Sequence, residues 1–147
     1  MKRNRAFIGA SLILALSSAI VFADDPAPPT PLQADMKQIG AIFKDMSTNV
    51  ADTSRNQAFA ASAEQLVTLF TDVQNMVPSK IIPDDIAKLP ADQQPAALAD
   101  FKRLIQLEID NAKALQNAFQ SNDNAAATGI LQKMGATKKE GHGKYAG

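Results

Sequence analysis

A long helical pattern runs through residues 95–120, PAALADFKRLIQLEIDNAKALQNAFQ. Its apolar residues recur at intervals of three, four and seven positions: Leu98, Phe101, Ile105, Ala112, Leu115 and Phe119. This spacing places them on one face of an α-helix, whereas a half-buried strand would alternate with a period of two. We therefore predict one long amphipathic helix over these residues.

Two stretches before it carry the same spacing. The first extends from Pro31 to about Val50, with Thr30 as its N-cap and proline suited to the first helical position. The second follows residues 52–54 and is stopped by Pro78, because proline cannot continue a helix. Both stretches are therefore predicted to be helices of the same amphipathic kind.

A fourth stretch follows the turn at residues 121–123 and is expected to weaken at Gly141 and Gly143, where each glycine costs about 1 kcal/mol of helix stability relative to alanine. The first and last pairs of stretches are joined by only a few residues, which favours antiparallel neighbours. No segment alternates with period two. The sequence therefore predicts an all-α protein, an antiparallel up-down-up-down four-helix bundle, with one domain over residues 31–147.

The middle connection, residues 78–94, contains three prolines and so cannot be one helix. Its larger apolar residues make it too hydrophobic for a free linker: Ile81, Ile82, Ile86 and Leu89. We expect this segment to cover one end of the bundle, with a short helical turn over residues 84–89.

The N-terminal residues 1–23 have the features of an export signal. A basic segment that ends at Arg5 precedes an apolar stretch, and small residues then suit cleavage before Asp24. We expect this signal peptide to be removed; an uncleaved membrane anchor is the alternative. The proline-rich residues 24–30 are expected to be disordered.

Composition excludes several classes of site. Removal of the leader leaves 124 residues, with 12 basic and 15 acidic side chains and a net charge of −3, so there is no electrostatic footprint for nucleic acid. Cysteine is absent, which excludes disulfides, iron–sulfur clusters and cysteine-type zinc sites. The remaining metal ligands are carboxylates, methionines and a single histidine.

Met36 and His142 are expected to meet at one end of the bundle. The up-down-up-down order brings together the start of the first helix, the middle connection, Phe101 and the end of the last helix. A thioether and an imidazole across an apolar gap suit haem iron, and such ligation points to electron transfer rather than oxygen chemistry. By the same argument, Met46 and Met76 are expected near the opposite end as core residues.

The sequence resembles the soluble periplasmic cytochrome b562 family, which is related to the four-helix cytochromes c prime. The resemblance is carried by residues 32–39, LQADMKQI, by the proline-rich middle connection, by the pair Asp100-Phe101 and by residues 142–145, HGKY. It implies non-covalent haem b, iron protoporphyrin IX, with Met36 and His142 as axial ligands. No Cys-x-x-Cys-His motif is present, so haem cannot be attached through thioethers.

The resemblance also implies further haem-binding residues. Phe101 would pack on the haem, with Ile105 beside it on the same helix face. Lys138 is the cation best placed for the haem propionates. Tyr145 would either hydrogen-bond at the haem edge or anchor the last helical turn, and the sequence leaves both roles open.

These features together predict a periplasmic electron carrier of a Gram-negative-type envelope. We expect a monomer that shuttles single electrons between redox partner proteins which the sequence does not identify, with no membrane span after cleavage. We do not expect an enzyme, since there is no nucleophile–base pair and no Gly-rich phosphate loop. One alternative is a haem-free helical bundle that binds proteins or responds to envelope stress, and another is weak binding of copper or nickel by the histidine and nearby carboxylates.

Overall fold

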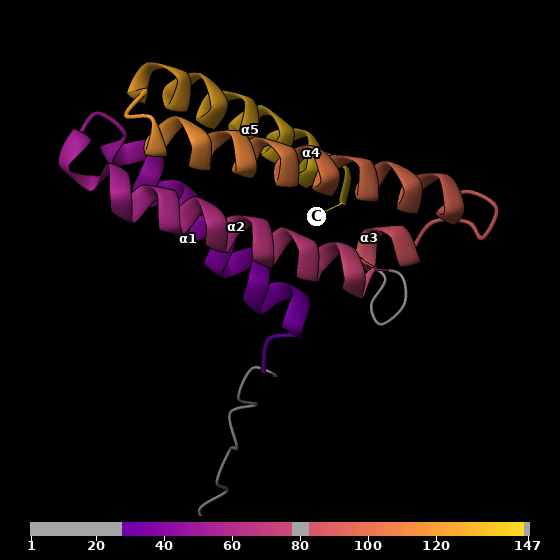
Figure 1. Cartoon of the computed structure of the whole chain (residues 1–147). Coiled ribbons are helices and arrows are strands. Elements are labelled where there is room, and N and C mark those ends of the chain that lie inside the picture. Colours follow the sequence, from indigo (N-terminus) through magenta and orange to yellow (C-terminus); the bar gives the residue numbers. More distant parts are fainter. Residues whose placement is uncertain (1–27, 78–82, 146–147) are drawn as a thin grey trace, which may run out of the picture.

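The computed structural model describes residues 28–77 and 83–145. Four long helices pack antiparallel, as Figure 1 shows: α1 (Pro31–Asn49), α2 (Asn56–Met76), α4 (Gln94–Gln120) and α5 (Asn124–Tyr145). A 3₁₀ turn, η1 (Thr53–Arg55), precedes α2, and a one-turn helix, α3 (Asp84–Ala87), lies between α2 and α4. The predicted all-α four-helix bundle is confirmed. The expected leader, its cleavage site and residues 24–27 lie outside the described residues, as do Ile81 and Ile82.

Local hydrogen bonds explain where α1 begins. The Gln33 backbone N–H donates to Thr30 Oγ1 at 3.2 Å, and the Thr30 backbone N–H donates to Gln33 Oε1 at 2.9 Å. This reciprocal arrangement is a capping box, and Pro31 occupies the first helical position behind it. The predicted N-cap role of Thr30 is therefore confirmed, and Thr30 belongs to the helix cap although it also falls within residues 24–30, which were expected to be disordered.

The turn between α4 and α5 has the hydrogen bonds of a Schellman motif. The Asp123 N–H donates to the Ala118 carbonyl at 2.8 Å, and the Asn122 N–H donates to the Phe119 carbonyl at 3.1 Å. Asn122 takes the left-handed conformation that this motif requires, with φ of 56°. The buried Asn56 side chain then donates to Asn122 Oδ1 at 3.0 Å, which ties the start of α2 to this turn.

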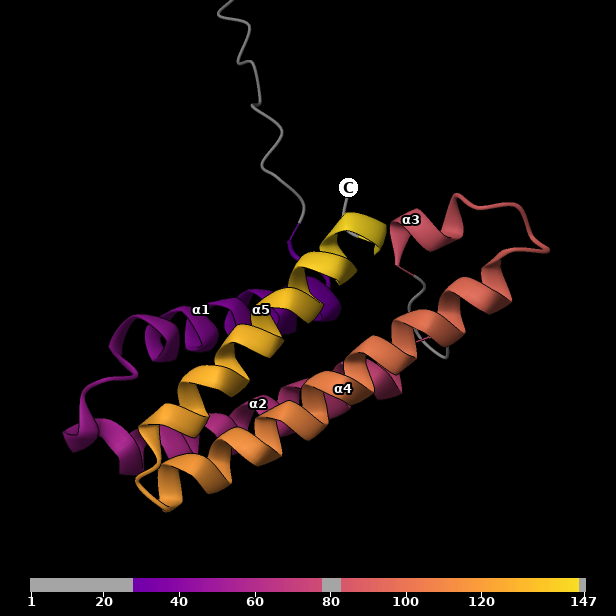
Figure 2. The same ribbon diagram turned by 90° about the horizontal axis from the view of Figure 1, so that it is seen from above.

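Helix packing is uneven around the bundle. Helix α2 packs along α4, α4 along α5 and α1 along α2, whereas α1 and α5 make few contacts with each other. The core between the tightly packed helices includes Phe59 and Phe119, which are buried with their ring centroids 5.2 Å apart. Figure 2 shows the start of α1, the end of α5 and α3 on the same side of the molecule. The bundle is thus closed at the Asn122 end and wider between α1 and α5 at the other end.

Three expectations need correction. Helix α5 continues through Gly141 and Gly143 to Tyr145 instead of weakening there, because its last turn is tethered to α4 as described below. The short helix in the middle connection ends at Ala87, before the predicted residue 89. Met76 does not lie at the opposite end of the bundle from His142: it is the last residue of α2, and this end of α2 lies near α3 (Figure 1).

Candidate functional site

A cavity of about 560 Å³ lies between α1 and α5 at the wider end of the bundle. Helices α1, α4 and α5 supply most of its lining, while Phe70 comes from α2 and residues 83–85 close the α3 side. The lining is mostly apolar, and the size falls in the range of small-molecule and cofactor sites. All six residues singled out from the sequence line this one cavity: Met36, Phe101, Ile105, Lys138, His142 and Tyr145.

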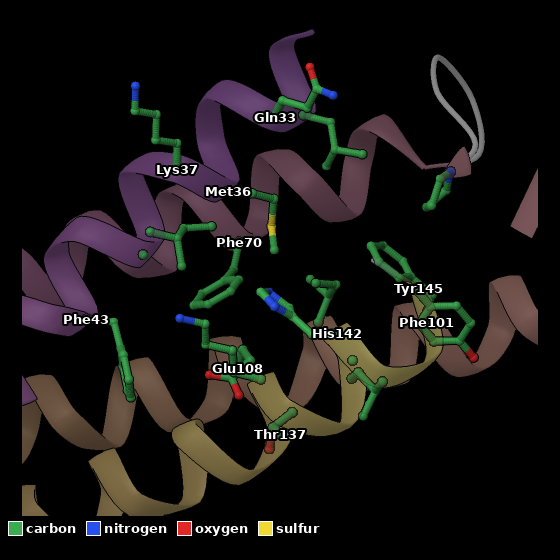
Figure 3. A pocket seen from close by; sticks show the side chains of 18 of the residues that line it. Gln33, Met36, Lys37, Phe43, Phe70, Phe101, Glu108, Thr137, His142 and Tyr145 are labelled. Atoms are coloured by element: carbon green, nitrogen blue, oxygen red, sulfur yellow. The ribbon is translucent and has the colours of Figure 1, made fainter. Parts of the chain in front are cut away.

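Met36 and His142 approach the cavity from different helices. The Met36 thioether points inward from the second turn of α1, and the His142 ring points inward from the last turn of α5 (Figure 3). Met36 is half-buried and packs against the core, whereas His142 is exposed. Glycine at position 40, one turn after Met36, also lines the cavity, and a Cβ there would meet nothing within 4 Å.

Aromatic and aliphatic side chains form the cavity walls. Phe101 and Ile105 are buried on α4, and Phe70 is buried on α2. Phe43, half-buried on α1, closes the side away from Tyr145 (Figure 3). Apolar side chains therefore surround the cavity on several sides, which suits a large, flat and mainly hydrophobic ligand.

Among the described residues, two lysines line the cavity, Lys37 on α1 and Lys138 on α5. The Lys138 Nζ lies over the Phe43 ring, 5.6 Å from the ring centroid. Both lysines are exposed, so neither is committed to a buried ion pair. In the described part of the chain, these two lysines are suited to pair with carboxylates carried by a ligand.

The end of α5, which carries His142, is held to α4 by the Asp100 carboxylate. Tyr145 OH donates to Asp100 Oδ2 at 2.7 Å, and Lys144 Nζ donates to the same oxygen at 2.9 Å. Arg103 donates to Asp100 Oδ1 at 2.7 Å and to Glu140 at 3.2 Å. The Tyr145 ring also packs edge-on against Phe101, with centroids 5.7 Å apart. Of the two roles left open for Tyr145, the geometry shows the anchoring one.

These hydrogen bonds change the acidity of the residues that make them. Donation from Lys144, then from Tyr145 and Arg103, holds the pKa of Asp100 well below its usual range. Contacts with Glu140 and Asp100 raise the pKa of Lys144 above its ordinary value. The charged forms are therefore favoured, and the tether between α4 and α5 is present throughout the neutral range.

A buried carboxyl group, Glu108, also lines the cavity. Only 6% of this residue is exposed, and its Oε1 atom has no hydrogen-bond partner among the described residues. Burial raises its pKa to about 7, and the polar Thr137 side chain opposes part of that shift. Among the described residues, Glu108 is the one acidic residue that is buried.

Comparison with protein families decides the relationship. A family model described as cytochrome b562 matches residues 31–146, which is most of the chain. The chain belongs to the cytochrome b562 family. Comparisons with curated proteins and with solved structures returned no match.

Membership in the cytochrome b562 family implies a haem-binding electron carrier. The family is not enzymatic, typically binds haem b and is typically periplasmic. The cavity fits such a group, because it combines apolar walls, a thioether and an imidazole on opposing helices, and exposed lysines for the propionates. Within residues 28–77 and 83–145, no cluster of three histidine, cysteine or acidic residues could hold a bare metal ion.

Sequence reasoning missed two parts of this cytochrome b562 cavity. Phe70, which is buried on α2 and was assigned no role in the site from the sequence, also lines the cavity. Glu108 had not been singled out. Its signal was available, since it stands three residues after Ile105 and four before Ala112, on the face that should be apolar.

Proposed function

We propose that this cytochrome b562 family member is an exported electron carrier that binds haem b non-covalently, with Met36 and His142 as the axial ligands. The observation that carries the proposal is that both side chains line one apolar cavity from opposing helices. When bound, haem would supply a one-electron iron couple, whose potential is raised by methionine and histidine ligation.

The other cavity residues would bind the haem and orient it. Phe101, Ile105 and Phe70 exclude water from the ligand's faces and add dispersion contacts. Lys138 and Lys37 would hold the two propionates by charge-assisted hydrogen bonds. Tyr145 acts indirectly, since its hydroxyl binds Asp100 and keeps the turn that carries His142 against α4.

Export and partners complete the proposal. The N-terminal sequence features and the family's typical location support a periplasmic protein, which would exchange electrons with other redox proteins there. In the described part of the chain, no helix combines the length and apolarity needed to cross a membrane. We propose that the carrier acts as a monomer.

The ligand assignment is tested by two substitutions in the haem-loaded protein. Met36→Leu keeps the bulk of the side chain but removes the sulfur, so it should shift the iron toward a high-spin spectrum and lower the reduction potential. Met76→Leu is the matched control, because Met76 is half-buried and does not line the cavity. A Met36→Leu protein with the parent spectrum and potential would exclude Met36 as a ligand.

The proposed role of His142 as a haem ligand is tested by measuring how fast the protein loses haem. His142→Ala should lose haem at least tenfold faster to an excess of haem-scavenging apomyoglobin, and added imidazole should partly restore the low-spin spectrum. Unchanged retention together with an unchanged spectrum would exclude His142 as a ligand.

A further inference from the structure

Glu108 is a buried ionisable residue of the cavity to which the proposed function assigns no role. It lies on α4 among buried apolar neighbours, Ile105 and Ile109, and its side chain reaches the cavity beside Thr137 (Figure 3). Buried polar atoms are nearly always hydrogen-bonded, so the unpartnered Oε1 atom requires an explanation. An acidic residue at this depth must either remain protonated or bear the cost of a buried charge.

The charged and titratable groups around the cavity come from three other helices. Helix α5 contributes Lys138, His142 and Tyr145, and α1 contributes Lys37. Asp84 and Asp85 line the α3 side, while α2 contributes only the apolar Phe70. Among the described residues, Glu108 forms no ion pair with any of these cations.

Without an ion-pair partner, the carboxyl group responds to any charge that is added to the cavity. Burial already raises its pKa to about 7, where a small change in local potential alters its protonation. An added negative charge stabilises the protonated form, and the effect is larger in an apolar cavity than in water. Electron transfer to a group in this cavity adds one such charge.

We propose that Glu108 is a proton-binding site that couples proton uptake to the arrival of an electron in the cavity. This rests on the proposed function, because the electron must be held by haem. In the coupled step, a one-electron reductant, either a redox partner protein or an electrode, supplies the electron. The Glu108 carboxylate takes one proton from solvent, forming one O–H bond, and oxidation returns that proton to water.

Coupling of this kind is reciprocal. If reduction raises the proton affinity of Glu108, protonation of Glu108 must make reduction easier by the same free energy. The reduction potential should therefore fall as pH rises through the neutral range. The slope can reach, but not exceed, about 59 mV for each tenfold change in proton activity, the limit for one proton per electron.

The test is the reduction potential of the haem-loaded protein between pH 5 and pH 9. Propionates titrate as well, so the protein is loaded both with haem b and with its dimethyl ester, in which the propionates cannot ionise. We expect a pH-dependent potential with both cofactors, and Glu108→Gln should abolish the dependence with the dimethyl ester. Asp110→Asn, an exposed carboxylate on the same helix, is the matched control and should keep it.

A flat profile for the ester-loaded parent, or an unchanged slope in Glu108→Gln, would overturn the proposal. The protonation state is also read directly, from the infrared band of a protonated carboxyl that appears on reduction. This band should be present in the parent and absent in Glu108→Gln. If it persists in the variant, another group takes the proton.

A measurement without haem separates the two proposals. In the haem-free protein, the Glu108 side-chain carboxyl carbon should titrate near neutral pH by NMR. Normal acidic titration would overturn the proton site itself. A protein with the near-neutral titration that binds no haem would instead refute the proposed function and, with it, the coupling.

Discussion

At the scale of single residues, Glu108 and Asp100 show that the surroundings of a carboxyl group determine its pKa, even when both groups lie on the same helix. Asp100 is surrounded by donors, so its pKa is lowered, whereas Glu108 faces apolar side chains and its pKa is raised. The first stabilises the fold when charged and the second when neutral. The two groups therefore make opposite contributions to stability as pH changes.

Glu108→Gln should stabilise the haem-free protein at alkaline pH. Because the folded pKa of about 7 exceeds the ordinary value of 4.5, the contribution of Glu108 to stability is full below pH 4.5 and is lost as pH rises through 7. Relative to the parent, the variant should gain up to about 3 kcal/mol between pH 4.5 and pH 8. Urea unfolding at both pH values measures this change, and an equal difference at both would contradict a buried, titrating Glu108.

At the scale of secondary-structure elements, the end of α5 depends on contacts with α4 more than on its own sequence. Gly141 and Gly143 lower the intrinsic stability of the last turn. Lys144 and Tyr145 offset this loss of helix stability because both bind Asp100 on α4. A second link between the two helices, the ion pair of Arg103 with Glu140, lies about one helical turn away. The turn that presents His142 is thus fixed by tertiary contacts.

Asp100→Asn should loosen this turn without unfolding the bundle. The tether is fully present above the usual carboxyl pKa and is lost only as pH falls through the lowered folded value, so the effect should be visible at neutral pH. Amide exchange at residues 141–145 should accelerate roughly two- to tenfold, as expected for partly exposed ion pairs. Asp110→Asn is the control on the same helix, and equal exchange rates in both variants would refute the tether.

In contrast to Asp100→Asn, the substitution Gly143→Ala should stabilise the last turn of α5. A Cβ at this position would meet nothing within 4 Å, so alanine gains helix propensity without a steric cost. The free energy of unfolding should rise by up to about 1 kcal/mol, with less gain if the terminal turn frays. Thermal unfolding followed by circular dichroism measures the change; a lowered midpoint would show that the glycine is required by its surroundings.

At the scale of the whole molecule, most of the architecture was predictable because helix periodicity, prolines and short connections all agree. The three- and four-residue spacing around Phe101 predicted α4, and the short connections predicted which ends of the bundle coincide. The persistence of α5 past Gly141 was not predictable, since it depends on a contact with Asp100 that is distant in sequence. The place of Glu108 on the apolar face of α4 could be read from the spacing, but the absence of a hydrogen-bond partner for its Oε1 among the described residues could not, since it depends on how the helices pack.

The bundle should be stabilised as a whole by the ligand that its cavity fits. A ligand that binds only the folded state stabilises it by mass action, by about 2.7 kcal/mol at a hundredfold excess over the dissociation constant. Added hemin should therefore raise the midpoint of thermal unfolding in a concentration-dependent way. The same titration with His142→Ala is the control and should show a smaller shift.

The most direct test of the central claim is the absorption spectrum of the exported protein, oxidised and reduced, followed by acid–acetone extraction. We expect a low-spin spectrum with the far-red band of methionine bound to ferric iron, and complete extraction of the haem. A colourless protein that takes up no added hemin would contradict the account and leave a haem-free helical bundle.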